Sequence, residues 1–183
     1  MEHLSNTEIR ALLTAAKAHR ERDWLMILVG FWHGLRASEV TAITAGSIAD
    51  GYITVARLKG SRKTCQPLVD DADPLMNEAA GLFEYARGMH ANQRLFPISR
   101  VQFYRCVQRY GLAAGIPKRN AHPHILKHSI AMQSIKTAGI ENVRQYLGHE
   151  SMSSTGAYLK VSDSAASAAV TGGVGGTLDR RPV

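Results

Sequence analysis

The stretch "GYITVARLKGSRKTCQPLV", residues 51–69, has the pattern of a β-hairpin in a chain whose other segments are helical. β-Branched and aromatic residues fill "YITV", a basic turn with a central glycine follows, and "CQPLV" can return as a second strand. This segment therefore predicts a hairpin whose tip carries cations.

Helical patterns surround the hairpin on both sides. "LSNTEIRALLTAAKAH" places Ser5 three residues ahead of Glu8, the spacing of a capping box, and continues with an apolar stripe. A second apolar segment covers residues 24–33, and a short helix is expected after Gly34. Further helical patterns cover residues 74–88, 99–114, 123–138 and 140–147. The predicted class is α+β: mainly α, with a small antiparallel hairpin or three-stranded sheet.

Composition limits the kinds of partner. The chain has 183 residues, enough for one domain with a core, and 45% of them are hydrophobic. Twenty-two Lys and Arg against fifteen Asp and Glu give a formal net charge of +7. This balance favours a polyanionic partner such as nucleic acid. Residues 162–183 are small and glycine-rich, which predicts a flexible tail.

Neither a secretory nor a membrane segment is apparent. Cys65 and Cys106 form no spacing pattern, and the apolar stretch at 24–32 is too short to span a bilayer. The N-terminus lacks the basic and apolar regions of a signal peptide. These features favour a cytoplasmic, reduced protein with no membrane partner.

A cluster of His122, His124, Lys127 and His128 has two interpretations from its residue types. His124 and His128, four positions apart on a helix, have the spacing of two zinc ligands. A third ligand is missing, however, and the Lys127 ammonium would repel a divalent ion. The second interpretation, of His128 as an ordinary hydrogen-bonded helix residue, is favoured, and no metal or other cofactor is expected.

Four motifs in a fixed order suggest another use for this cluster. The motifs are "GLRASEV" with Arg36, "LKGSRK" with Lys59, "HPHILKH" with His124 and Lys127, and "YLGHESMSSTGAY" with His149 and Tyr158. Together they resemble the catalytic domain of tyrosine site-specific recombinases, the phage integrase family, over residues 5–161. The stretches "HGLRASE", "SRVQFY" and "HPHILKHS" also resemble the short fimbrial phase-switch invertases.

The resemblance implies that Tyr158 is a nucleophile that attacks a DNA phosphodiester and forms a 3′-phosphotyrosine. Arg36 and Lys127 would hold the two non-bridging oxygens of that phosphate. Lys127 departs from the family pattern, which has H-x-x-R where this chain has H-x-x-K. Arginine grips phosphate with two parallel donors, whereas lysine is a compact point charge. The substitution keeps the charge and loses the fork.

The remaining site residues have supporting roles under the same resemblance. His149 would donate a further hydrogen bond, and His124 would act as a general base or an orienting partner. Lys59 on the hairpin would protonate the leaving 5′-oxygen. Glu39, three residues after Arg36, is expected to orient that arginine or to cap the helix. Neither ATP nor a metal ion is required.

A basic helix provides a DNA-binding surface. In "ISRVQFYRCVQRYG" a serine N-cap precedes several cationic side chains, and the resemblance places the start of this helix in the major groove. The residues expected to bind DNA are Arg100, Gln102 and Arg105 on the helix and Arg62 and Lys63 on the hairpin. A solvated basic helix face is the alternative. The expected partners are double-stranded DNA, further copies of the chain in a tetramer, and accessory DNA-bending proteins.

The sequence thus predicts a catalytic domain at residues 1–161 without an N-terminal core-binding domain, acting in inversion or in integration and excision. Two other functions stay open. A type IB topoisomerase uses a similar constellation, but normally with a clamp domain. A DNA-binding accessory factor that has lost catalysis would explain Lys127.

Overall fold

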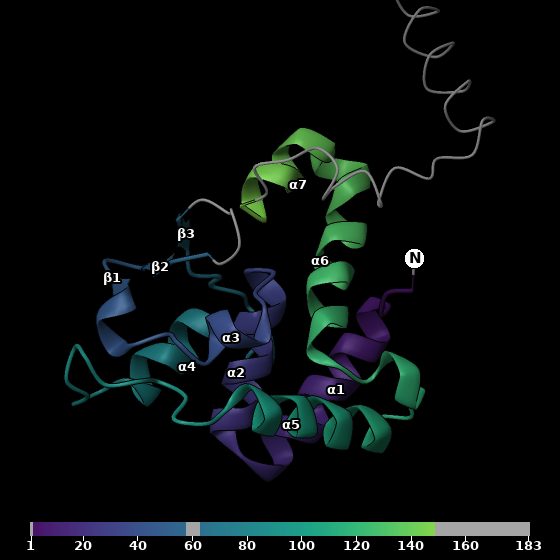
Figure 1. Ribbon diagram of the computed structural model, residues 1–183, viewed down its shortest axis with the longest axis horizontal. Helices are drawn as coiled ribbons and strands as arrows, with labels where there is room; N and C mark the ends of the chain where they lie inside the picture. The colour runs from purple at the N-terminus through teal and green to yellow at the C-terminus, as the bar shows by residue number, and fades with distance from the viewer. Residues whose placement is uncertain (1, 58–62, 149–183) are drawn as a thin grey trace, which may run out of the picture.

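The computed structural model describes residues 2–57 and 63–148, which are mostly helical (Figure 1). The helices are α1 (Asn6–His19), α2 (Glu21–Trp32), α3 (Ala37–Val40), α4 (Glu78–Tyr85), α5 (Arg100–Ala113), α6 (Pro123–Ala138) and α7 (Ile140–Tyr146), with short 3-10 turns at Ala45–Ser47 and Lys118–Asn120. The strands are β1 (Ile48–Ala49), β2 (Tyr52–Val55) and β3 (Thr64–Pro67). The expected α+β class is confirmed.

Helix α2 forms the centre of the core. All nine residues from Asp23 to Phe31 are buried. Helices α1, α4 and α6 pack around it, and α5 crosses the base of the molecule against α1 and α6 (Figure 1). An apolar segment that neighbours surround on several sides needs no polar face. This explains why residues 24–33 lack the alternating polar positions of a surface helix.

The sheet is antiparallel with the strand order β1-β2-β3. β2 pairs with β3 from Tyr52↔Pro67 to Val55↔Thr64, which confirms the predicted hairpin. Strand β1 is added by a tight turn at Asp50 and Gly51, where both residues have a positive φ. The tip of the hairpin, 58–62, lies outside the described residues.

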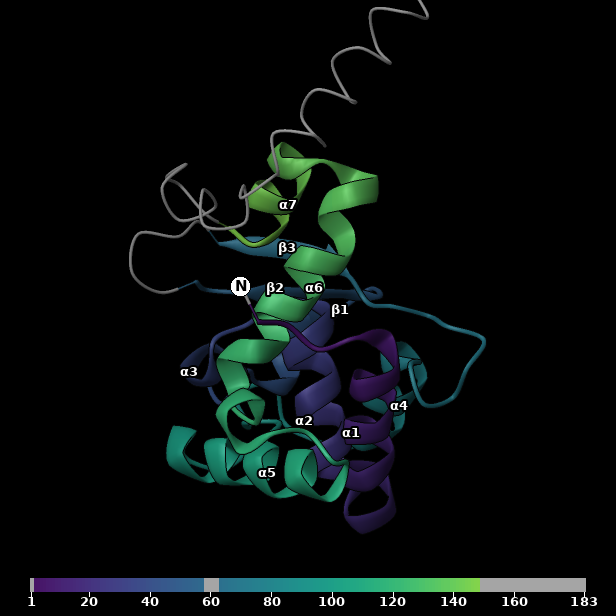
Figure 2. The ribbon, with the colours of Figure 1, turned by 90° about the vertical axis from the view of Figure 1, so that its right-hand side faces the viewer.

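Helices α6 and α7 bring the end of the described chain to the sheet (Figure 2). The approach depends on Gly34, at the turn between α2 and α3, which has a φ of 56°. A Cβ atom at this position would collide with the side chain of Leu147. Glycine therefore allows the end of α7 to pack against the turn that precedes Arg36.

Helix α4 begins four residues later than the sequence pattern predicts, at Glu78. The Asn77 side chain accepts a hydrogen bond from Ala80 N at 2.9 Å and caps the helix. Before it, the Asp73 carboxylate accepts from Leu75 N at 2.9 Å and stabilises a turn. Local side-chain bonds thus delay the helix.

Candidate active site

Arg36 lies at the N-cap of α3, where the backbone is extended with φ −76° and ψ 156°. The carboxylate of Glu39, three residues further along the chain, holds Arg36 in place. One carboxylate oxygen accepts from Arg36 N at 2.8 Å, and the other accepts from Arg36 Nη1 at 2.9 Å. Glu39 is buried, whereas 29% of the Arg36 side chain is exposed. The carboxylate therefore both caps the helix and orients the guanidinium, so the two expected roles of Glu39 are combined.

The first turns of α6 supply the histidines and the lysine. His124 lines a cavity of about 410 Å³ together with Arg36, so two motifs about 90 residues apart meet at one surface. The His124 and His128 rings pack edge to face with centroids 4.3 Å apart. Within residues 2–57 and 63–148, no group of three or more His, Cys, Asp or Glu side chains has a metal-binding arrangement.

Lys127 is buried beneath this surface, with only 2% of the residue exposed. Its Nζ donates to the carbonyl oxygen of Leu147 at 3.5 Å, a long hydrogen bond. Burial, together with the positive charges of Arg36 and Arg57, lowers the pKa of Lys127 to about 7 against the opposing effect of Glu39. The pKa of this amine is therefore close to neutral pH, where a small change in pH adds or removes its charge.

The neighbouring histidines are neutral near pH 7. Burial lowers the pKa of His124, with added repulsion from Lys127, His122 and Arg36. Burial likewise lowers the pKa of His128 to about 4, with repulsion from His124. A neutral imidazole has one nitrogen that accepts a hydrogen bond. His124 is therefore in the protonation state that a general base or an accepting partner requires.

Arg57, which the motif analysis did not select, lies at the centre of the site with its side chain fully buried. All three guanidinium nitrogens donate hydrogen bonds. The acceptors are Thr64 Oγ1 at 2.9 Å, His33 O at 2.9 Å, Gly34 O at 3.2 Å, Gln66 Oε1 at 3.4 Å and Tyr146 O at 3.5 Å. Its Nη1 also lies 3.5 Å from Glu39 Oε2. Arg57 therefore ties the turn before Arg36 to the sheet and to α7.

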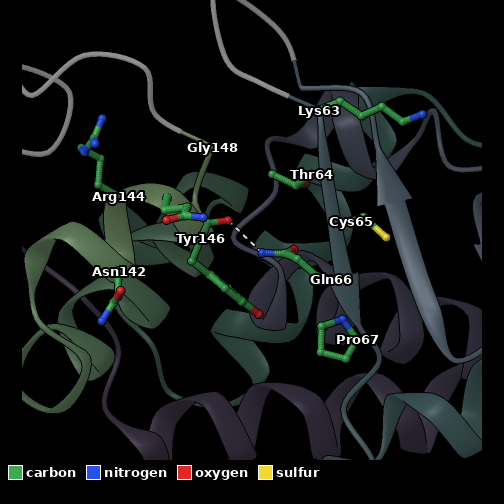
Figure 3. Close-up of a pocket in the computed structure, with 10 residues that line it drawn as sticks. Lys63, Thr64, Cys65, Gln66, Pro67, Asn142, Arg144, Tyr146 and Gly148 are labelled. Carbon is green, nitrogen blue, oxygen red and sulfur yellow. Dashed lines mark hydrogen bonds between the residues drawn. The ribbon is translucent and has the colours of Figure 1, made fainter.

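A second buried group continues this network into the core. Gln66 Nε2 donates to Tyr146 O at 2.8 Å, the dashed contact in Figure 3, which joins β3 to α7. Its Oε1 lies 2.9 Å from His33 Nδ1, and His33 Nε2 lies 2.8 Å from Glu78 Oε1. Both ring nitrogens of His33 therefore lie within hydrogen-bonding distance of side-chain oxygens. The network rigidly connects α2, β3, α4 and α7.

The hairpin side of the site is partly described. Lys63 and Gln66 line a cavity of about 650 Å³ between β3 and α7, with Arg144 and Gly148 on its opposite side (Figure 3). Lys63 is exposed. Four expected site residues lie outside the described residues: Lys59, Arg62, His149 and Tyr158.

The expected DNA-binding residues of α5 are all exposed. Ser99 caps the helix, and its side chain accepts from Gln102 N at 3.2 Å. In return, Gln102 Oε1 accepts from Ser99 N at 2.8 Å. The oxygen of Gln102 is therefore engaged in the capping box. Arg100 and Arg105 take no part in this capping box in the described structure.

Residues 2–165 match the model of the phage integrase family. This chain belongs to the phage integrase family. The resemblance inferred from the four motifs is thereby confirmed. Within the part of the chain that the structure describes, no helix is both long and apolar enough to cross a membrane.

Curated relatives include fimbrial regulators and recombinases. The type 1 fimbriae regulatory protein FimB of Escherichia coli is 31% identical over 163 residues, covering 83% of this chain and 80% of FimB. The tyrosine recombinase XerA of Thermococcus kodakarensis is 28% identical over 165 residues, covering 86% of this chain and 57% of XerA. The chain therefore spans most of FimB but little more than half of XerA.

Solved structures share the fold. A crystal structure of XerA recombinase aligns with a TM-score of 0.72 at 23% identity, covering 99% of this chain and 65% of that chain. The catalytic domain of bacteriophage HP1 integrase aligns with a TM-score of 0.66 at 23% identity, covering 93% and 94%. The expected recombinase catalytic-domain fold is confirmed.

Proposed function

We propose that this chain is a site-specific recombinase that cleaves and rejoins duplex DNA through a 3′-phosphotyrosine intermediate. The observation that carries the proposal is that Arg36 and His124, from two motifs far apart in the sequence, line one cavity of a phage integrase family member, with Lys127 buried on the same helix as His124. Inversion or integration and excision are the outcomes that this chemistry serves. We assign the catalytic domain to residues 1–161.

The phosphate would be held by Arg36 and Lys127. Glu39 fixes the guanidinium of Arg36 from one side, and the side chain stays partly exposed for an incoming oxygen. Lys127 contributes a buried amine whose charge a bound phosphate would stabilise. A preorganised cation in a poorly solvated site stabilises developing negative charge strongly. The two residues would thus neutralise the pentavalent transition state.

The bond exchange needs a nucleophile and a leaving-group acid. The phenol oxygen of Tyr158 would attack phosphorus as its proton passes to a base, for which we propose His124. The bond from phosphorus to the 5′-oxygen would break, and Lys59 would give that oxygen a proton. His149 would donate a hydrogen bond to the phosphate. Religation is the reverse reaction with a different 5′-hydroxyl, so neither ATP nor a metal ion is needed.

DNA binding would combine the hairpin with α5. We propose that Arg62 and Lys63 contact the backbone and that Arg100, Gln102 and Arg105 contact the duplex from α5. Among structures with this fold is a lambda integrase tetramer bound to a Holliday junction. We propose that this chain also acts as a tetramer on two duplexes, in the cytoplasm and with DNA-bending proteins.

The test is capture of the covalent intermediate. Wild-type protein and the Tyr158→Phe variant are incubated with a nicked suicide duplex that contains the recognised site, and adducts are counted on denaturing gels. We expect an adduct with the wild type and none with Tyr158→Phe, while both bind the duplex equally in a mobility shift. An adduct that survives in Tyr158→Phe would overturn the nucleophile assignment.

A second candidate function is a DNA-binding accessory factor without catalysis, which the replacement of the family arginine by Lys127 favours. The same experiment separates the two candidates. If the protein is an accessory factor, the wild type should bind the duplex specifically but form no adduct under any condition. If the wild type forms no adduct but Lys127→Arg does, the lysine at position 127 has inactivated an otherwise complete recombinase site.

A further inference from the structure

Helix α5 exposes two large apolar side chains near its start. Val101 is 51% exposed and Tyr104 is 44% exposed. They are three positions apart on a helix and therefore share a face. Leu112, at the other end of α5, is 49% exposed, but it does not line the cavity beside Arg36. Apolar side chains gathered at one exposed surface often mark a binding site.

Val101 and Tyr104 form part of the same cavity that holds Arg36 and His124. The cavity of about 410 Å³ is lined by Arg100, Val101 and Tyr104 from α5, by Arg36 and Ala37 at the start of α3, and by His122, Pro123 and His124 at the start of α6. The cavity wall thus combines two apolar side chains, Val101 and Tyr104, with two arginines, Arg36 and Arg100. A matching ligand has an apolar group close to a negative charge.

The hydrogen bonding of Gln102 gives a second reason to assign base recognition to Val101 and Tyr104. A glutamine reads adenine through both its amide nitrogen and its oxygen. The Gln102 oxygen already accepts from Ser99 N at 2.8 Å, so bidentate reading would compete with the capping box for this oxygen. Losing an N-cap interaction would destabilise the start of α5. Sequence reading at this end of α5 therefore depends more on its other exposed side chains.

We infer that this cavity is a subsite for a thymine beside the reacting phosphodiester, with Val101 and Tyr104 contacting the thymine 5-methyl group. The inference rests on the proposed function. In the major groove the methyl group of thymine is the apolar feature that distinguishes it from the other bases, and apolar side chains recognise it. Arg36 and Arg100 would meet the adjoining phosphates, which fits the mixed character of the wall.

The experiment removes only the methyl group. The recognised site is first obtained by selecting duplexes from a random pool with the full chain. Each thymine near the cleavage position is then replaced by deoxyuridine, and dissociation constants are compared. Burial of one methyl group corresponds to about a fourfold change in affinity. We expect one replacement to weaken wild-type binding by about this factor.

Three variants make the result specific. Val101→Ala and Tyr104→Ala should bind the thymine and deoxyuridine duplexes equally, because the contact is lost from the protein side. Leu112→Ala, an exposed apolar residue of the same helix, should keep the wild-type discrimination. Thermal melting verifies that each variant folds. If Val101→Ala and Tyr104→Ala both still discriminate thymine from deoxyuridine as the wild type does, other residues contact the methyl group and the inference is overturned.

The outcomes also separate this inference from the proposed function. If the protein forms the covalent adduct but the selected site has no thymine whose methyl group matters, only the thymine subsite is wrong. If the protein neither binds duplex DNA nor forms an adduct, the proposed function is wrong. If it binds and discriminates without forming an adduct, the subsite stands and the accessory-factor function is favoured.

Discussion

Lys127 differs chemically from the arginine of the family pattern because its charge can be lost. A guanidinium stays protonated at any pH that a protein tolerates. The Lys127 amine is buried with a pKa of about 7, so a rise in pH through neutrality removes its charge in the free protein. In the proposed role of Lys127 as a phosphate contact, phosphate binding would therefore depend on pH, whereas with an arginine it would not.

This difference gives a prediction for the pH dependence of cleavage. Below pH 7 the amine is charged and can bind phosphate, and above pH 7 the free protein must take up a proton to do so. We expect single-turnover cleavage at a subsaturating DNA concentration to fall about fivefold between pH 7 and pH 8, because the charged fraction of an amine with a pKa of about 7 falls from about one half to about one tenth. Lys127→Arg should show a weaker decline, and Lys127→Ala should cleave about a hundredfold more slowly than the wild type at pH 6, with a gap that narrows as the wild-type amine loses its charge.

The comparison between wild type and Lys127→Arg is the matched control, because other titrating groups are common to both. Parallel pH profiles for the two proteins would show that Lys127 does not contribute the pH dependence. Normal cleavage by Lys127→Ala would show that the residue does not contact the phosphate.

At the level of elements, Arg57 connects segments that the sequence keeps apart. Its hydrogen bonds reach the α2–α3 turn, β3 and the end of α7. Removal of the guanidinium would take the side-chain donor from the backbone oxygens of His33 and Gly34. Each unsatisfied buried acceptor costs about 1–3 kcal/mol. The stability of the site therefore depends on one arginine.

We predict that Arg57→Met lowers the free energy of unfolding by ~3 kcal/mol or more, measured by urea denaturation. Arg87→Met on α4 is the control, because Arg87 is 71% exposed and its ion pair with Glu84 lies at the surface. An exposed pair of this kind contributes less than about 1 kcal/mol. Equal stability of the two variants would show that the buried network does not hold the elements together.

Elements set by local interactions were predictable from the sequence. The Ser5–Glu8 capping box is present as expected, with Ser5 N donating to Glu8 Oε2 at 2.8 Å. The hairpin was also predictable, because its β-branched residues and turn are contiguous. The start of α4 was not, since the Asp73 turn and the Asn77 cap displace it.

Within the candidate site, the ordered motifs predicted Arg36, His124 and Lys127, whereas they did not select Arg57. Its roles come from contacts with distant segments, which no local pattern encodes. A signal was nevertheless present: Ile53, Val55 and Arg57 alternate on the buried side of the β2 segment. An arginine at a position where strand alternation predicts an apolar residue indicates a buried charge with partners. The burial of Lys127 likewise depends on packing against α7.

For the whole molecule, an excess of positive charge accompanies a site that gathers cations. The formal net charge is +7, and Arg36, Lys63 and Arg100 line cavities around the site. Such a charge attracts DNA of any sequence through release of counterions from its phosphates. Nonspecific affinity should therefore depend steeply on salt, whatever the recognised sequence is.

The salt dependence also tests whether Lys63 contacts the DNA backbone. Affinity for a random-sequence duplex is measured over a range of salt concentrations, and the slope of log affinity against log salt counts the neutralised phosphates at about 0.9 per contact. We predict that Lys63→Ala reduces the magnitude of this slope by about 0.9, because one phosphate contact is lost. Arg87→Ala removes the same charge from α4 and should leave the slope unchanged, since its guanidinium is paired with Glu84. If both variants change the slope equally, the effect comes from net charge alone, and Lys63 is not a specific phosphate contact.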